Sequence, residues 1–155
     1  MPTLRDHLLG DDRQRVVSDT CHLIDSEMGS KRGVRAVPLK AAYKLVKGFK
    51  PGFVPSVVDA MLPEFCDALE PYYQTWAGKG ASRGPLDAEL RRQEGPVAEA
   101  LLGVADRRGN NANMRGASAI QKAYRKLRGT ARGHVASALP GLARTVEPFL
   151  KGLDG

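Results

Sequence analysis

The sequence predicts an all-α fold built from two similar halves. Apolar residues recur at helical spacing along most of the chain, no stretch shows the alternation typical of a strand, and the sequence partly repeats when shifted by 81 residues. With 155 residues, 42% of them hydrophobic and 26% charged, the chain has the length and composition of one globular domain. We therefore expect a single domain, residues 1–155, with about three helices per half packed around a pseudo-two-fold axis.

The repeat is clearest where residues 43–56 lie over residues 124–137, because a Tyr, two Gly, a Val and a Ser coincide. Further along, the offset falls to 77, and Glu70 then meets Glu147. The difference is about one helical turn, which a helix can lose while keeping the same face inward. The predicted halves are about 3–76 and 84–153, joined by a Gly-rich connector at 77–85. The alternative is a coincidence in a chain rich in Ala, Gly, Leu and Arg.

Three helices are expected in the first half. One follows Asp11 or Asp12, a suitable N-cap, and runs to about Met28. The second begins near Pro38, which suits a first helical turn, and Gly48 stops it. The third starts near Val54-Pro55, and Pro63 is expected to kink or restart it. The second half mirrors this pattern, with apolar stripes that start near Val97, Ile120 and Val135.

Positive charge is concentrated in corresponding parts of the two halves. The net charge is +7, yet residues 30–58 hold seven basic residues and no acids, and residues 107–144 hold nine and again no acids. The rest of the chain is therefore acidic, and the two basic stretches are the strongest functional signal in the sequence.

The basic residues follow helical spacing and lead to glycines. Lys40, Lys44 and Lys47 recur at i, i+4 and i+7, and the second half repeats this ridge. The pairs Gly48/Gly52 and Gly129/Gly133 then lead into an expected helix N-terminus, where free N–H groups favour an anion. The candidate anion- or nucleic-acid-binding residues are Lys40, Lys44, Lys47, Lys50, Gly52, Lys122, Arg125, Arg128, Arg132 and Gly133.

An ordinary structural explanation competes with the functional one. Lysines opposite an apolar face are usually a solvated surface, and a Gly pair is more often a C-cap and turn than a phosphate cradle. Acidic residues of the flanking helices, Asp25 among them, could also pair with the ridge.

Other functional sites are not indicated. The two cysteines, Cys21 and Cys66, fall at apolar helical positions, and we expect buried, inert thiols. The three histidines and the recurring carboxylates show no metal-ligand or paired-acid spacing. We therefore expect no metal, no cofactor and no enzymatic activity. The sequence shows no secretory signal and no apolar run near the roughly 20 residues of a membrane span, so we expect a cytoplasmic protein with no membrane partner.

Several runs of residues resemble a known family. The segments Leu39–Lys47, Pro51–Val54, Leu62–Phe65 and Ala68–Pro71, together with Lys122–Val135, are similar to a family of small, uncharacterised bacterial helical proteins. The similarity covers most of the chain. It implies the duplicated helical fold and no catalytic residues.

The sequence thus predicts a helical binding protein that engages a polyanion, most naturally nucleic acid, through two equivalent basic faces. The alternative is a protein-interaction or assembly module whose basic faces dock an acidic partner or a second copy.

Overall fold

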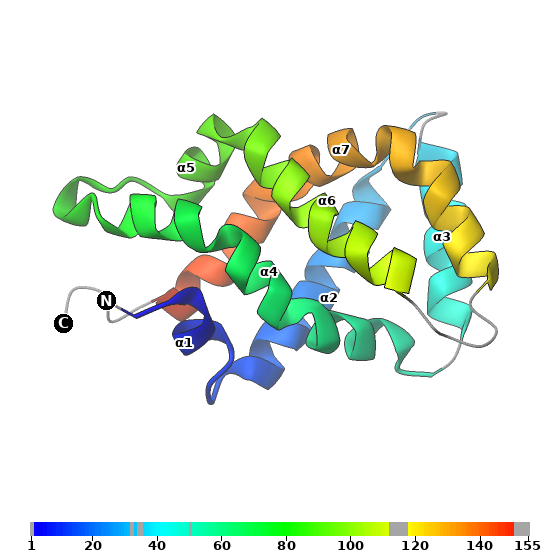
Figure 1. The fold of residues 1–155 in the computed structure, drawn as a ribbon, viewed down its shortest axis with the longest axis horizontal. Coiled ribbons are helices and arrows are strands. Elements are labelled where there is room, and N and C mark those ends of the chain that lie inside the picture. Colours follow the sequence, from blue (N-terminus) through cyan, green and yellow to red (C-terminus); the bar gives the residue numbers. More distant parts are fainter. Residues whose placement is uncertain (1, 32, 34–35, 50, 112–117, 151–155) are drawn as a thin grey trace.

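The computed structural model describes residues 2–31, 33, 36–49, 51–111 and 118–150, with the side chains of 108–111 and 118–120 left undescribed. Within these ranges the chain forms helices and no strand, which confirms the predicted all-α class (Figure 1). The elements in order are α1 (Leu4–Leu8), α2 (Arg13–Ser30), α3 (Ala36–Phe49), α4 (Phe53–Ala77), the 3-10 turn η1 (Gly80–Ser82), α5 (Leu86–Arg92), α6 (Glu94–Asn111), α7 (Ser118–Val146) and the 3-10 turn η2 (Glu147–Leu150).

Four long helices form the core. Helix α4 packs against α2 and α6, and α7 packs against the same two helices. The short helix α1 lies on α4, and the short helix α5 lies on α7. The largest fully buried side chains come from α2, α6 and α7, and they are Val16, Val97, Val104 and Leu139. Their burial supplies the main driving force for this packing.

The second and third helices predicted for the second half are one helix. The sequence predicts a break at Gly129–Gly133, and this prediction is wrong, since α7 runs through both glycines without interruption. In Figure 1 the ribbon nevertheless changes direction between the yellow first turns of α7 and the orange part that follows. Closely spaced glycines permit such a bend without ending a helix.

The first half breaks at the corresponding place because its residues differ. Pro51 cannot donate the backbone hydrogen bond that continues a helix, and Gly52 has a φ of +74°, which side chains other than Gly rarely adopt. Neither Gly129 nor Gly133 has a positive φ, and the second half has no proline between them. Prolines inside α4 and α7 leave those helices continuous, so the expected restart at Pro63 does not occur.

The Gly-rich segment 77–85 lies between α4 and α5. Helix α4 ends at Ala77, η1 occupies Gly80–Ser82, and α5 begins at Leu86. Trp76 is buried, and its Nε1 donates a 2.7 Å hydrogen bond to the carbonyl oxygen of Gly84. This contact fastens the returning connector to the end of α4.

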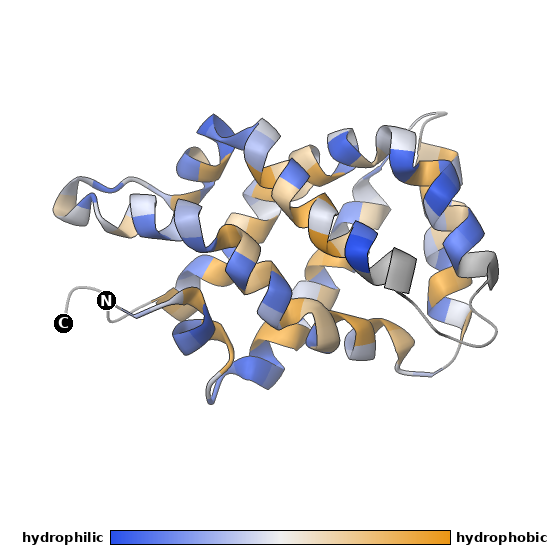
Figure 2. Ribbon diagram, in the orientation of Figure 1, coloured by the Kyte–Doolittle hydropathy of each residue, from blue (hydrophilic) through white to orange (hydrophobic). Residues whose placement is uncertain are grey.

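Apolar residues face the interior along most helices, while polar residues gather on the outside (Figure 2). Of the helices in the described ranges, none combines the length and the hydropathy that a membrane crossing requires.

Candidate functional site

The two basic stretches meet at one end of the molecule. Helix α3 packs against α7, and Figure 1 shows the first turns of α7 in front of α3, away from the connector and α5. Neither α3 nor α7 contains an Asp or a Glu. The fold therefore brings together two acid-free helices that are far apart in the sequence.

Five basic residues of this end, four of them predicted site residues, make no ion pair with any described residue. Lys40 and Lys44 belong to α3, and Lys44 is exposed while Lys40 is half-buried. Lys122, Arg125 and Lys126 follow one another on α7, and all three are exposed. We call these five side chains the basic end.

Two other ridge residues are held by carboxylates. Lys47 Nζ lies 3.3 Å from Asp25 Oδ1 on α2. Arg128 makes a bidentate contact with Asp106 on α6, with Nε 3.0 Å from Oδ1 and Nη2 3.1 Å from Oδ2. Lys47 and Arg128 thus attach the basic helices to the core helices and contribute less to an external anion site than the sequence predicts.

A tyrosine completes each of these contacts. The hydroxyl of Tyr43 donates to Asp25 Oδ1, and the hydroxyl of Tyr124 donates to Asp106 Oδ1 at 2.5 Å. In both halves the tyrosine follows the aspartate by 18 residues, and the cation follows it by 22. The sequence analysis missed the role of the tyrosines, although their helical spacing from Lys47 and Arg128 is the signal that could have revealed it.

The tyrosine contacts fix the protonation states of both groups. Hydrogen bonding by Tyr43, followed by Lys47, lowers the pKa of Asp25, and Tyr124 followed by Arg128 lowers the pKa of Asp106. Burial and the bond to the carboxylate raise the pKa of Tyr124 to about 12 and also raise that of Tyr43. Each tyrosine is therefore a neutral donor near pH 7 and each aspartate is an anion.

The remaining predicted residues are dispersed. Arg132 is exposed, and its Nε lies 3.4 Å from Glu99 Oε1 on α6. Gly52 is the left-handed residue before α4, as expected for a turn, while Gly133 lies inside α7, so the predicted helix N-terminus there is wrong. The amide groups next to Gly133 are used in the helix and offer no notch for an anion. Lys50 lies outside the described residues.

The outer face of α3 carries apolar residues that the sequence analysis did not select. Leu39, Tyr43 and Val46 of α3 are half-buried. Val37 and Leu45, however, are 64% and 42% exposed. Their spacing of eight residues places them on one side of the helix.

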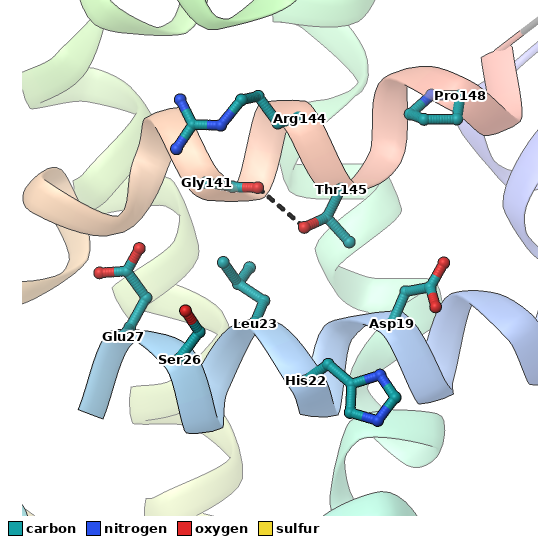
Figure 3. A pocket seen from close by; sticks show the side chains of 9 residues that line it. All are labelled: Asp19, His22, Leu23, Ser26, Glu27, Gly141, Arg144, Thr145 and Pro148. Carbon is teal, nitrogen blue, oxygen red and sulfur yellow. Dashed lines mark hydrogen bonds between the residues drawn. The ribbon is translucent and has the colours of Figure 1, made fainter. Parts of the chain in front are cut away.

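A groove of about 440 Å³ runs between α2 and the end of α7 (Figure 3). Its floor is a close approach of the two helices, since a Cβ at Gly141 would lie 2.7 Å from Leu23 Cδ1. Charged groups of both signs line it, including Asp19, Glu27 and Arg144. This mixture of charges and the open shape of the groove do not indicate a particular class of ligand. The groove also lies outside the predicted site.

Cys66 is buried and Cys21 half-buried, and both are free thiols. Burial raises the pKa of Cys66 to about 11, which fits an unreactive side chain. In the part of the chain that the structure describes, no three His, Cys, Asp or Glu side chains are grouped to hold a metal ion.

Comparison with known proteins gives one match. The model of a family of unknown function (DUF6918) matches residues 4–150. No curated protein and no solved structure matches the chain.

Proposed function

The chain belongs to the DUF6918 family of unknown function, and we propose that it is a non-enzymatic protein that binds nucleic acid through the basic end. The observation that carries this proposal is the placement of five cations, none ion-paired with a described residue, on two neighbouring helices that contain no acid. A nucleic acid backbone is a common biological polymer that presents a row of negative charges, and binding releases the counterions condensed on it.

The form of the site favours backbone contact over base stacking. Proteins that bind single strands present aromatic side chains on which bases stack. On α3 and α7 the tyrosines Tyr43 and Tyr124 are half-buried, with their hydroxyls bonded to aspartates. Lysine and arginine alone form the exposed contact set, and such contacts position a duplex without reading its sequence.

We also infer that the two halves arose by duplication and are related by a pseudo-two-fold axis. The bounds of α2 and α6 differ by 81 residues at both ends. The N–H of Leu4 donates to Glu70 Oε1 at 2.7 Å, and the N–H of Leu86 donates to Glu147 Oε1 at 2.6 Å. Each contact joins the first residue of a short helix to a glutamate, which is Glu70 within α4 in the first half and Glu147 directly after α7 in the second. On this relationship, α3 and the first turns of α7 are equivalent and meet across the axis.

Surface ion pairs support the same relationship, because each half has one between its short helix and a long helix, with the acidic and basic residues exchanged. Arg5 on α1 makes two 2.6 Å contacts with Asp67 on α4. In the second half the acid is on the short helix, where Asp87 of α5 lies 4.0 Å from Arg144 of α7. A pair kept at one place with reversed polarity is expected of duplicated halves that diverged together.

Fluorescence anisotropy with a labelled 24-base-pair duplex of arbitrary sequence tests the binding proposal. Five phosphate contacts predict an affinity that falls by about 500-fold between 50 and 200 mM salt. The single variants K44E, K122E and R125E should each weaken binding, and the triple variant should abolish it at the higher salt. The matched control is R91E, which reverses an exposed charge on α5, remote from the basic end.

Two results would contradict the proposal. One is the absence of binding at 50 mM salt, and the other is an equal loss of affinity in R91E and in the three variants of the basic end. A single strand of the same length is measured in parallel, and it should bind more weakly than the duplex.

A further inference from the structure

The outer side of α3 is apolar as well as basic. Val37 and Leu45 are 64% and 42% exposed, and in the part of the chain whose side chains are described they are the only large hydrophobic residues in the exposed class. Pro38 and Ala41 are also exposed. Scattered exposed apolar residues are ordinary in soluble proteins, but these share one short helix.

Helical spacing turns these residues into a stripe. Val37, Ala41 and Leu45 recur every four residues, which places them along one side of α3. Lys40 and Lys44 lie one residue before Ala41 and Leu45 and form one edge of the stripe. We call Val37, Ala41 and Leu45 the α3 stripe.

The fold does not require this stripe. At the corresponding places on α7, 81 residues later, the sequence has Ser118, Lys122 and Lys126. Lys122 and Lys126 are exposed, so lysine is compatible with a helix in this position. The inward residues of α3, among them Leu39 and Tyr43, already provide its packing. The apolar character of the outer side is therefore specific to α3.

We propose that the α3 stripe is the docking site for an amphipathic helix of an acidic partner protein. Apolar side chains of that helix, three and four residues apart, would cover Val37 and Leu45, and carboxylates beside them would meet Lys40 and Lys44. Helix α3 has 14 residues and so spans about 21 Å, enough for a partner helix of four turns.

Charge selects this occupant over the alternatives. A second copy docked by the same helix would bring lysines against lysines, because α3 holds no acid to neutralise them. A nucleic acid backbone offers no apolar surface to Val37 and Leu45. An acidic amphipathic helix satisfies both the apolar stripe and its basic edge.

The test uses a fluorescein-labelled 18-residue designed peptide, with Leu at the a and d positions of a helix and Glu flanking them. Control peptides carry Lys in place of Glu, or Ser in place of Leu. Anisotropy with the full chain should show binding of the Glu–Leu peptide at least 10-fold tighter than of either control. V37S, L45S and K44A should each weaken this binding 5-fold or more. A88S and R91A, which change exposed residues on α5, should leave it unchanged.

The same variants separate this proposal from nucleic-acid binding. V37S and L45S should keep the duplex affinity of the parent chain, whereas K44A should lower both affinities. Unaltered thermal unfolding of V37S and L45S, followed by circular dichroism, shows that they fold.

Four results would overturn docking of an acidic helix. The first is peptide binding that V37S and L45S do not change, and the second is equal binding of the Lys-substituted peptide. The third is a dimer in sedimentation velocity that L45S dissociates, and the fourth is binding to vesicles of 30% phosphatidylglycerol in phosphatidylcholine that L45S abolishes while the peptide does not bind. The third identifies a second copy as the occupant, and the fourth an anionic membrane.

Discussion

The carboxylate of Asp106 on α6 accepts a 2.5 Å hydrogen bond from the hydroxyl of Tyr124 on α7. Asp25 on α2 and Tyr43 on α3 are joined in the same way. Each basic helix is thus tied to a core helix by a neutral donor and a cation that share one aspartate. The contact is more covered in the second half, where the aspartate side chain is 34% exposed compared with 52% in the first half.

Removing the hydroxyl of Tyr124 should destabilise the protein. In Y124F, Asp106 keeps Arg128 but loses its shortest hydrogen bond, and the free energy of unfolding should fall by about 1 kcal/mol. Urea unfolding at pH 7, followed by circular dichroism, measures this. The control is Y72F, because the hydroxyl of Tyr72 makes no hydrogen bond with any described residue, and its unfolding should match that of the parent. A loss in Y72F equal to that in Y124F would refute the assignment.

Stability should depend on Asp106 in acid. The pKa of Asp106 is below the ordinary value of 3.8 because Tyr124 and then Arg128 favour its anion. Its stabilising contribution is therefore complete above pH 3.8 and is lost as the pH falls through the lowered pKa of the folded state. Between pH 5 and pH 2, D106N should lose less stability than the parent chain. Urea titrations of D106N and of the parent chain at several pH values test this.

Replacing His134 by Phe should stabilise the protein and alter its behaviour near pH 6. Burial, and then the charge of Lys31, lower the pKa of His134 from 6.5, and its buried Nε2 receives no hydrogen bond from a described residue. The neutral form is required by the fold, so its stability is present above pH 6.5 and is lost as the pH falls through the lowered value. Phe53, at the corresponding place in the first half, is buried.

The free energy of unfolding of H134F should therefore exceed that of the parent by about 1 kcal/mol at pH 7, because a buried unpaired polar atom is removed. The difference should be larger at pH 5, where the parent has lost the stability that depends on neutral His134. Thermal unfolding at the two pH values measures the difference. An H134F variant whose stability changes with pH between 7 and 5 as steeply as that of the parent would exclude this role for the histidine.

Two glycines of α7 should respond differently to alanine. Nothing lies within 4 Å of a Cβ built at Gly133, so G133A should gain about 1 kcal/mol from helix propensity. At Gly141 the added Cβ would lie 2.7 Å from Leu23 Cδ1 and 2.9 Å from Glu27 Oε1. The required shift of α2 side chains should cancel the gain, leaving G141A at least about 1 kcal/mol less stable than G133A. Equal midpoints in urea would show that α2 and α7 are not in close contact there.

Sequence patterns predicted the helices well where capping and periodicity agree. The start of α2 after Asp12 and the start of α4 after Gly52 are confirmed. The predicted break inside α7 was wrong because the pair Gly129/Gly133 was treated as equivalent to the Pro51-Gly52 turn. Glycine permits a helix to end, but without a proline or a positive φ the backbone hydrogen bonds continue.

The candidate site was predicted only in part. Helical spacing identified the lysine ridge, yet it does not reveal which carboxylates of other helices approach it. Asp25, Asp106 and Glu99 reach Lys47, Arg128 and Arg132 through the packing of α2 and α6, which depends on tertiary structure. The α3 stripe was overlooked for a similar reason, since only burial distinguishes the inner apolar side of α3 from the outer one.

The reversed polarity of the surface pairs has a consequence for assembly of the chain. On the proposed two-fold relationship, α1 placed on α7 in place of α5 would bring Arg5 toward Arg144, and the opposite exchange would bring Asp87 toward Asp67. Each misplacement replaces an attraction with a repulsion, a difference of about 1 kcal/mol or less at an exposed site. The opposite polarity of the two ion pairs thus favours the placement of α1 and of α5 each in its own half as the chain folds.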